Sequence, residues 1–223
     1  MARLARVVLP GVPHHITQRG VRSIDVFHQD GDRQFYCELV RSARDDYGIT
    51  VLSYCLMKNH IHLIVIPETE NSLRQGIGMI HRNYSRMINF REKNRGYLFQ
   101  GRFFSCPLDN KHLLSALKYI AQNPVRAGIC KEASGYYWSS TRYHLGLESE
   151  NLIIKDREWF GSPGDWKKLL SSPPDEIEVL RKHFRTGRPL GNEAFLLEAE
   201  RVTGRKLIPK KPGRKKRQGD QMI

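Results

Sequence analysis

Hydrophobic and polar positions follow two different periods in the first third of the chain. Residues 14–19 alternate like a short strand, and residues 30–47 carry apolar side chains every four positions, which predicts a helix. Residues 49–57 and 60–66 are rich in β-branched and aromatic side chains and flank a two-residue turn at Lys58-Asn59. The pattern therefore predicts a strand, a helix and an antiparallel hairpin, in that order.

A long helix is predicted from Ser72, because apolar residues recur there three and four positions apart. A strand over 102–106 and a helix over 109–122 follow, the helix beginning at Asp109 as N-cap and ending before Pro124. The predicted order of elements is strand, helix, hairpin, helix and strand, followed by one extra helix. This order predicts an α+β fold. It is a ferredoxin-like split βαβ sandwich whose antiparallel sheet has its helices on one face.

Glycine, proline and serine interrupt the regular pattern around residues 145–176, and this break divides the chain. Residues 1–145 form the main domain, 146–200 a linker and small helical appendix, and 201–223 a basic tail. The tail holds nine Lys or Arg against Asp220 alone, together with several Pro and Gly. We expect a mobile arm that neutralises phosphates; a solubilising tail without a specific partner is the alternative.

The charge of the chain favours a nucleic-acid partner. Lys and Arg number 37 against 23 Asp and Glu, a formal net charge of +14. An anionic membrane surface is the main rival, but no apolar run approaches the ~20 residues that span a bilayer. The first residues lack the apolar stretch of a secretory signal, and the four cysteines form no CxxC pair. We therefore expect a cytoplasmic protein without a membrane partner.

Two histidines alternate on the second strand of the predicted hairpin. His60 and His62 project from one face, while Ile61, Leu63 and Val65 project from the other. Two imidazoles roughly 6–7 Å apart along a strand can close on one cation, although they do not complete a metal site. Packed histidines with satisfied hydrogen bonds are the other interpretation.

A tyrosine and an asparagine lie one helical turn apart near the end of the last predicted helix. Tyr119 and Asn123 are i and i+4, so they share a face. A tyrosine in this place is most often a core or rim residue. An unassisted phenol, with a pKa near 10, is only about 0.1% phenolate at pH 7. A nucleophilic role would therefore need a neighbouring cation or base.

Six stretches, taken in order, resemble one family. The sequence is similar to the single-tyrosine transposases named for their His-hydrophobic-His motif (HUH), and within them to the REP-associated tyrosine transposases of bacteria. The stretches that carry the resemblance are 10–20, 57–64, 97–103, 119–128, 137–140 and, more loosely, 185–191. Lys58 stands where this family is expected to have proline, which alters the turn and leaves both histidines in place.

The resemblance implies a role for each motif residue. Tyr119 would attack a phosphodiester of single-stranded DNA and leave a 5′-phosphotyrosine and a free 3′-hydroxyl. His60 and His62 would bind a divalent metal, with Asn123 as third ligand. The family implies Mg²⁺ or Mn²⁺, and because imidazoles suit Mn²⁺ better than Mg²⁺, Mn²⁺ satisfies both arguments. The phosphotyrosine bond would conserve the energy of the cleaved phosphodiester, so rejoining the DNA strand would need no nucleotide cofactor. The sequence accordingly has no P-loop pattern.

The resemblance also implies the substrate: a palindromic repeat folded as a hairpin beside a short single-stranded guide, in the bacterial cytoplasm at the nucleoid. Basic residues of the N-terminal segment, the long helix and the strand after it are candidates for phosphate contacts. They are Arg3, Arg6, Arg19, Arg82, Arg86 and Arg102. For the helix arginines, a solvated face is the alternative.

Three functions remain open at this point. A metal-dependent DNA endonuclease and strand transferase leads. A non-catalytic nucleic-acid-binding regulator and a phosphoesterase that uses water, with Tyr119 only structural, are the others. The long C-terminal extension favours a monomer acting in cis over a homodimer with shared sites.

Overall fold

One four-stranded antiparallel sheet organises the part of the chain that the structure describes, which is residues 5–157 and 159–208 in this computed structural model. The strand order is β2-β3-β1-β4. The strands are β1 His14–Arg19, β2 Ile49–Met57, β3 His60–Pro67 and β4 Phe104–Pro107. The predicted hairpin is β2–β3, and β1 lies between β3 and β4, so the chain has the expected ferredoxin-like α+β arrangement.

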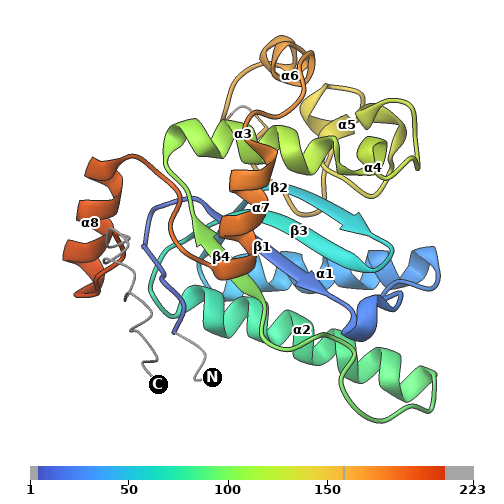
Figure 1. Cartoon of the computed structure of the whole chain (residues 1–223). Helices are drawn as coiled ribbons and strands as arrows, with labels where there is room; N and C mark the ends of the chain where they lie inside the picture. Colours follow the sequence, from blue (N-terminus) through green and yellow to red (C-terminus); the bar gives the residue numbers. More distant parts are fainter. Residues whose placement is uncertain (1–4, 158, 209–223) are drawn as a thin grey trace, which may run out of the picture.

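Two long helices cover one face of the sheet (Figure 1). They are α1 Asp30–Asp46 and α2 Ser72–Arg91, the two helices of the predicted βαββαβ unit. Alternate residues of β3, among them Ile61, Leu63 and Val65, are buried in the core beneath these helices. The apolar stripe of α2 faces the same core, with Tyr84 fully buried. This face is built as the hydrophobic pattern predicted.

The other face of the sheet is covered by later parts of the chain (Figure 1). Here the core joins β2 and β3 to α3 Asn110–Ala121, α6 Pro163–Leu170 and α7 Ile177–Thr186. Trp166 of α6 and Phe184 of α7 are among its buried side chains. The βαββαβ pattern places helices on one face only; the extra helix and the C-terminal appendix supply the second layer.

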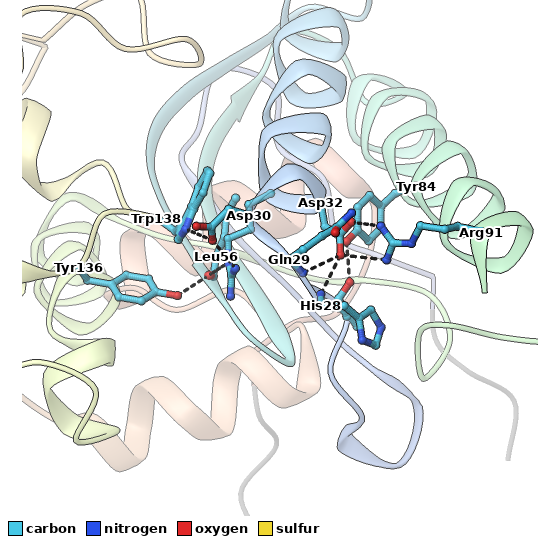
Figure 2. Close-up of polar contacts among 11 residues, drawn as sticks. His28, Gln29, Asp30, Asp32, Leu56, Tyr84, Arg91, Tyr136 and Trp138 are labelled. Carbon is cyan, nitrogen blue, oxygen red and sulfur yellow. Dashed lines mark hydrogen bonds and ion pairs between the residues drawn. The ribbon is translucent and has the colours of Figure 1, made fainter.

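Loops after the core elements cover both edges of the sheet. On the β2 side, the backbone N–H of Leu56 donates to Trp138 O (2.9 Å), and Tyr136 Oη donates to Leu56 O (2.8 Å; Figure 2). On the β4 side, the N–H of Leu190 donates to Pro107 O (2.9 Å). The segments around 138 and 190 therefore occupy hydrogen-bonding groups that an open sheet edge would expose.

Asp32 anchors the N-terminus of α1 to α2 (Figure 2). Its buried carboxylate accepts hydrogen bonds from the N–H groups of His28 (2.8 Å) and Gln29 (3.1 Å), which close a capping box. The guanidinium of Arg91, at the end of α2, forms an ion pair with the same carboxylate. Burial raises the pKa of Asp32, but these hydrogen bonds and the Arg91 charge outweigh it and hold the pKa below its usual value.

The remaining helices are short. They are α4 Asn123–Arg126, α5 Thr141–His144, α8 Glu193–Thr203 and the 3-10 turns Val21–Ser23 and Ala133–Gly135. The residues from 201 to 203, counted as tail in the sequence analysis, complete α8; residues 209–223 and Arg3 lie outside the described residues. Among the described residues, no helix is long and apolar enough to cross a membrane.

Candidate active site

The two histidines of the HUH motif stand side by side at the start of β3. Their ring centroids are 4.9 Å apart and the rings are perpendicular. Both face the α3 side of the sheet, opposite Ile61, Leu63 and Val65 of the same strand. His60 Nδ1 lies 2.6 Å from Asn59 Oδ1, and His62 Nδ1 lies 2.8 Å from His15 Nε2. Each ring therefore has its Nδ1 occupied and presents Nε2 as its other polar atom.

The end of α3 brings the tyrosine and the asparagine to this pair within one chain. Asp109 caps α3 as predicted, accepting from the N–H of His112 (2.9 Å), and α3 stops at Ala121 before Pro124. The ring centroids of Tyr119 and His62 are 5.8 Å apart. Asn123 Nδ2 lies 3.2 Å from His60 Nε2. The four predicted side chains, from β3, α3 and α4, thus lie next to one another in the fold.

Burial keeps the imidazoles neutral. It lowers the pKa of His60 to about 4, with a further contribution from the positive charge of Arg19. The pKa of His62 is well below its ordinary value because of burial and because His60, His15 and Arg126 are close. Neutral rings keep a lone pair on one nitrogen near pH 7. The electrostatics therefore favour a pair of ligands over a pair of cations.

Residues 12–123 match the family described as "Transposase IS200 like". This segment holds both histidines, Tyr119 and Asn123, and it amounts to half of the chain. The chain belongs to the IS200-like transposase family. Its core sheet, α1, α2 and α3 all fall within the matched residues, whereas α6, α7 and α8 follow them.

Relatives of the IS200-like chain point to one branch. A Haemophilus influenzae protein named as a REP-associated tyrosine transposase is 24% identical over 165 residues, which cover 66% of this chain and 91% of the relative. A solved REP-associated tyrosine transposase bound to a REP hairpin has the same fold, with a TM-score of 0.57 at 17% identity. That match covers 70% of this chain and 92% of the other.

The donor set of this transposase site suits a divalent cation that accepts nitrogen and oxygen. The hydrogen bonds to Asn59 and His15 occupy Nδ1 of His60 and of His62, and the amide nitrogen of Asn123 contacts His60 Nε2, so the amide lies beside the nitrogen that a cation would take. No group of three or more His, Cys, Asp or Glu side chains able to hold a metal occurs in the described part of the chain. A cation held by these residues would have two imidazoles and one amide as protein ligands, a set that suits Mn²⁺ better than Mg²⁺.

Four further residues surround this site, and the sequence analysis missed all of them. His15 contacts His62, and Phe184 of α7 packs on both His15 (centroids 3.6 Å) and Tyr119 (5.5 Å). Arg126 donates from Nη2 to Tyr119 O (2.8 Å) and lies with Cζ 4.2 Å from the centroid of the Tyr119 ring. A hydrogen bond with Tyr119 raises the pKa of Arg181.

The arginines expected to bind DNA are not in one place. Arg19 is exposed at the end of β1 and lies opposite His60 in the β1–β3 ladder. Arg6, Arg82 and Arg102 line one groove of about 490 Å³ between α2 and the loop before β4. Arg86 lines a different groove with residues of α1 and α2. The first groove is the stronger candidate for a nucleic-acid contact, because three of the predicted arginines meet there.

The aromatic residues near this groove divide between core and surface. Phe99 and Phe103 are buried, and the guanidinium of Arg6 stacks on Phe103 with Cζ 3.6 Å from the ring centroid. Tyr97, which also lines the groove, is 88% exposed. Of these three aromatic residues, only Tyr97 presents its ring to solvent, where a base could stack on it.

Proposed function

We propose that this IS200-like transposase cleaves and rejoins single-stranded DNA through Tyr119. The observation that carries the proposal is the meeting, within one chain, of a phenol, two neutral imidazoles and a side-chain amide. A regulator that only bound DNA would have no need of this arrangement. A basic groove and an exposed arginine at the end of β1 add the means to hold a phosphate backbone.

In the first step the Tyr119 oxygen attacks a DNA phosphorus. The bond between phosphorus and the tyrosine oxygen forms as the bond between phosphorus and the 3′-oxygen breaks. The phenol loses one proton and the departing 3′-oxygen gains one, so atoms and charge balance. Attack by another 3′-hydroxyl reverses the step and releases Tyr119 without ATP, because a phosphodiester has been exchanged for a phosphotyrosine ester of similar energy.

Side chains around Tyr119 position the reacting groups. Arg126 holds the backbone and ring face of Tyr119, and His60, His62 and Asn123 define the place of the scissile phosphate. A divalent cation bound by these three residues would polarise the phosphate and offset the charge that develops on it. Positioning of this kind lowers the barrier because the reactants need not be ordered at the moment of reaction.

The substrate that fits best is a DNA hairpin formed by a palindromic repeat, with single-stranded DNA beside it. Support comes from the basic groove and from the solved relative, which is bound to a REP hairpin. We place the protein in the bacterial cytoplasm at the nucleoid, acting as a monomer, since Tyr119 and the histidines meet in one chain.

The experiment is a covalent-capture assay. Wild-type protein is incubated with Mn²⁺ and a labelled single-stranded oligonucleotide that contains a hairpin and its flanks, and the products are separated on a denaturing gel. We expect a protein–DNA band that is lost in Tyr119→Phe and on chelation. Tyr137→Phe, at a tyrosine that is 66% exposed and outside the site, is the matched control and keeps the band.

The same gel distinguishes the rival functions. Cleavage that survives Tyr119→Phe would identify a phosphoesterase that uses water. Binding of the hairpin without any cleavage, under every metal tested, would identify a regulator. Either result would reject Tyr119 as the nucleophile.

A further inference from the structure

His15 and His62 form a buried pair that joins two strands of the sheet. In the β1–β3 ladder, His15 lies opposite Ile64 and His62 lies opposite Thr17, so the two histidines are diagonal neighbours on the α3 side. His15 Nε2 and His62 Nδ1 are 2.8 Å apart, and the rings stack with centroids 5.0 Å apart and planes inclined by 23°. His15 is 1% exposed.

This hydrogen bond selects the orientation of the His62 ring. A histidine ring can turn about its last side-chain bond among broad, roughly two-fold positions. Turning the ring by half a revolution would take Nδ1 away from His15 and exchange the positions of Nε2 and Cε1. An imidazole at position 15 can donate or accept, so the bond persists whichever nitrogen of His62 carries the proton.

His15 is poorly suited to a purely structural role. Its second nitrogen, Nδ1, is buried and has no hydrogen-bond partner among the described residues. A buried polar atom without a partner costs free energy, so an apolar ring of similar size would serve the core better. The benefit that offsets this cost is the contact with His62.

We propose that His15 is a positioning residue that holds His62 Nε2 toward the bound cation. The inference rests on the metal site of the proposed function, and it adds a residue that does not itself touch the cation. Phe184 of α7 presses on the other side of the His15 ring, with centroids 3.6 Å apart. Partners behind a metal-bound histidine typically change metal affinity about 10- to 100-fold when they are removed.

The test measures Mn²⁺ binding to the full chain without DNA, from the loss of the free Mn²⁺ signal in electron paramagnetic resonance. His15→Phe keeps a ring but removes the hydrogen bond, whereas His15→Gln keeps a group that both donates and accepts. We expect His15→Phe to bind Mn²⁺ about 10- to 100-fold more weakly than wild type. His15→Gln should restore most of the affinity, and thermal unfolding should show His15→Phe at least as stable as wild type.

Two controls separate this inference from the proposed function. If His60→Ala binds Mn²⁺ as wild type does, the metal site itself is wrong, and the role of His15 falls with it. If His60→Ala loses binding but His15→Phe keeps wild-type affinity, only the inference about His15 is overturned. Should His15→Phe fail to fold, ¹⁵N NMR of the histidine rings in metal-free wild type decides: a coupling through the hydrogen bond between His15 Nε2 and His62 Nδ1 supports the proposal, and its absence refutes it.

Discussion

Acid should destabilise this protein well above the pH at which carboxylates titrate, and His81 offers the cleanest measurement. The ring is 8% exposed, and its Nε2 lies 3.1 Å from Tyr36 Oη. Burial, together with the positive charge of Arg6, lowers the pKa of His81 to about 3 from an ordinary value of 6.5. His81 lies outside the metal site, so the prediction does not depend on the proposed function.

The sign and size follow from linkage between protonation and folding. Below pH 6.5 the unfolded chain binds a proton at this histidine while the folded chain does not, so stability falls as the pH drops from about 6.5 toward about 3. A pH of 5 is roughly 1.5 units below the pKa of the histidine in the unfolded chain. At about 1.36 kcal/mol per unit, protonation of the unfolded chain therefore lowers the free energy of unfolding by about 2 kcal/mol. At pH 7.5 this contribution is close to zero.

The assay is urea unfolding of wild type and His81→Gln at pH 7.5 and pH 5. Gln can keep a hydrogen bond with Tyr36 but does not titrate. When the pH falls from 7.5 to 5, we expect the free energy of unfolding to drop by about 2 kcal/mol more in wild type than in His81→Gln. His28→Gln, at an exposed histidine, is the control and should show no such change. An equal difference between wild type and His81→Gln at both pH values would refute the argument.

Three further outcomes are expected. Asp32→Ala should lower the free energy of unfolding by about 2–3 kcal/mol in urea, because it removes the cap of α1 and the buried half of the ion pair with Arg91, which keeps only Glu92 among the described residues; a loss under about 0.5 kcal/mol would contradict this. Arg126→Gln should slow the formation of the Tyr119 adduct about 10- to 100-fold in single turnover, and an unchanged rate would remove Arg126 from the site. Arg82→Gln should reduce the slope of log affinity for hairpin DNA against log salt by about 1, whereas Arg41→Gln, at an exposed residue of α1 that does not line the groove, should not.

Local sequence patterns correctly predicted those features of the structure that depend on residues close together in the chain. The alternation of His60 and His62 on a strand, the stop of α1 before Gly48 and the cap at Asp109 each depend on a few adjacent residues. The spacing of Tyr119 and Asn123 likewise indicated one helical face, and both side chains do reach the histidine pair even though Asn123 begins a new helical turn. These parts of the fold and site were predictable.

Contacts between distant segments were not predictable in this way. His15 meets His62 only because β1 pairs with β3 in one register, which no pattern within β1 specifies. Phe184 lies more than 60 residues after Tyr119, beyond a stretch of irregular sequence, and nothing local shows which face of the sheet α7 covers. The division between buried Phe103 and exposed Tyr97 also depends on how the loop before β4 crosses α2.

The proposed active site therefore extends beyond the segment that matches the family. Residues 12–123 contain the proposed nucleophile and the three proposed ligands, yet α7 packs against them from outside this range, with Phe184 against both His15 and Tyr119. Because α7 packs on the same sheet face as the histidines, changes in the C-terminal appendix would reach Tyr119 and the histidine pair directly. Relatives that share the matched residues but differ after them need not share the same site geometry, so variation in α7 is a physical route to different cleavage behaviour on one catalytic core.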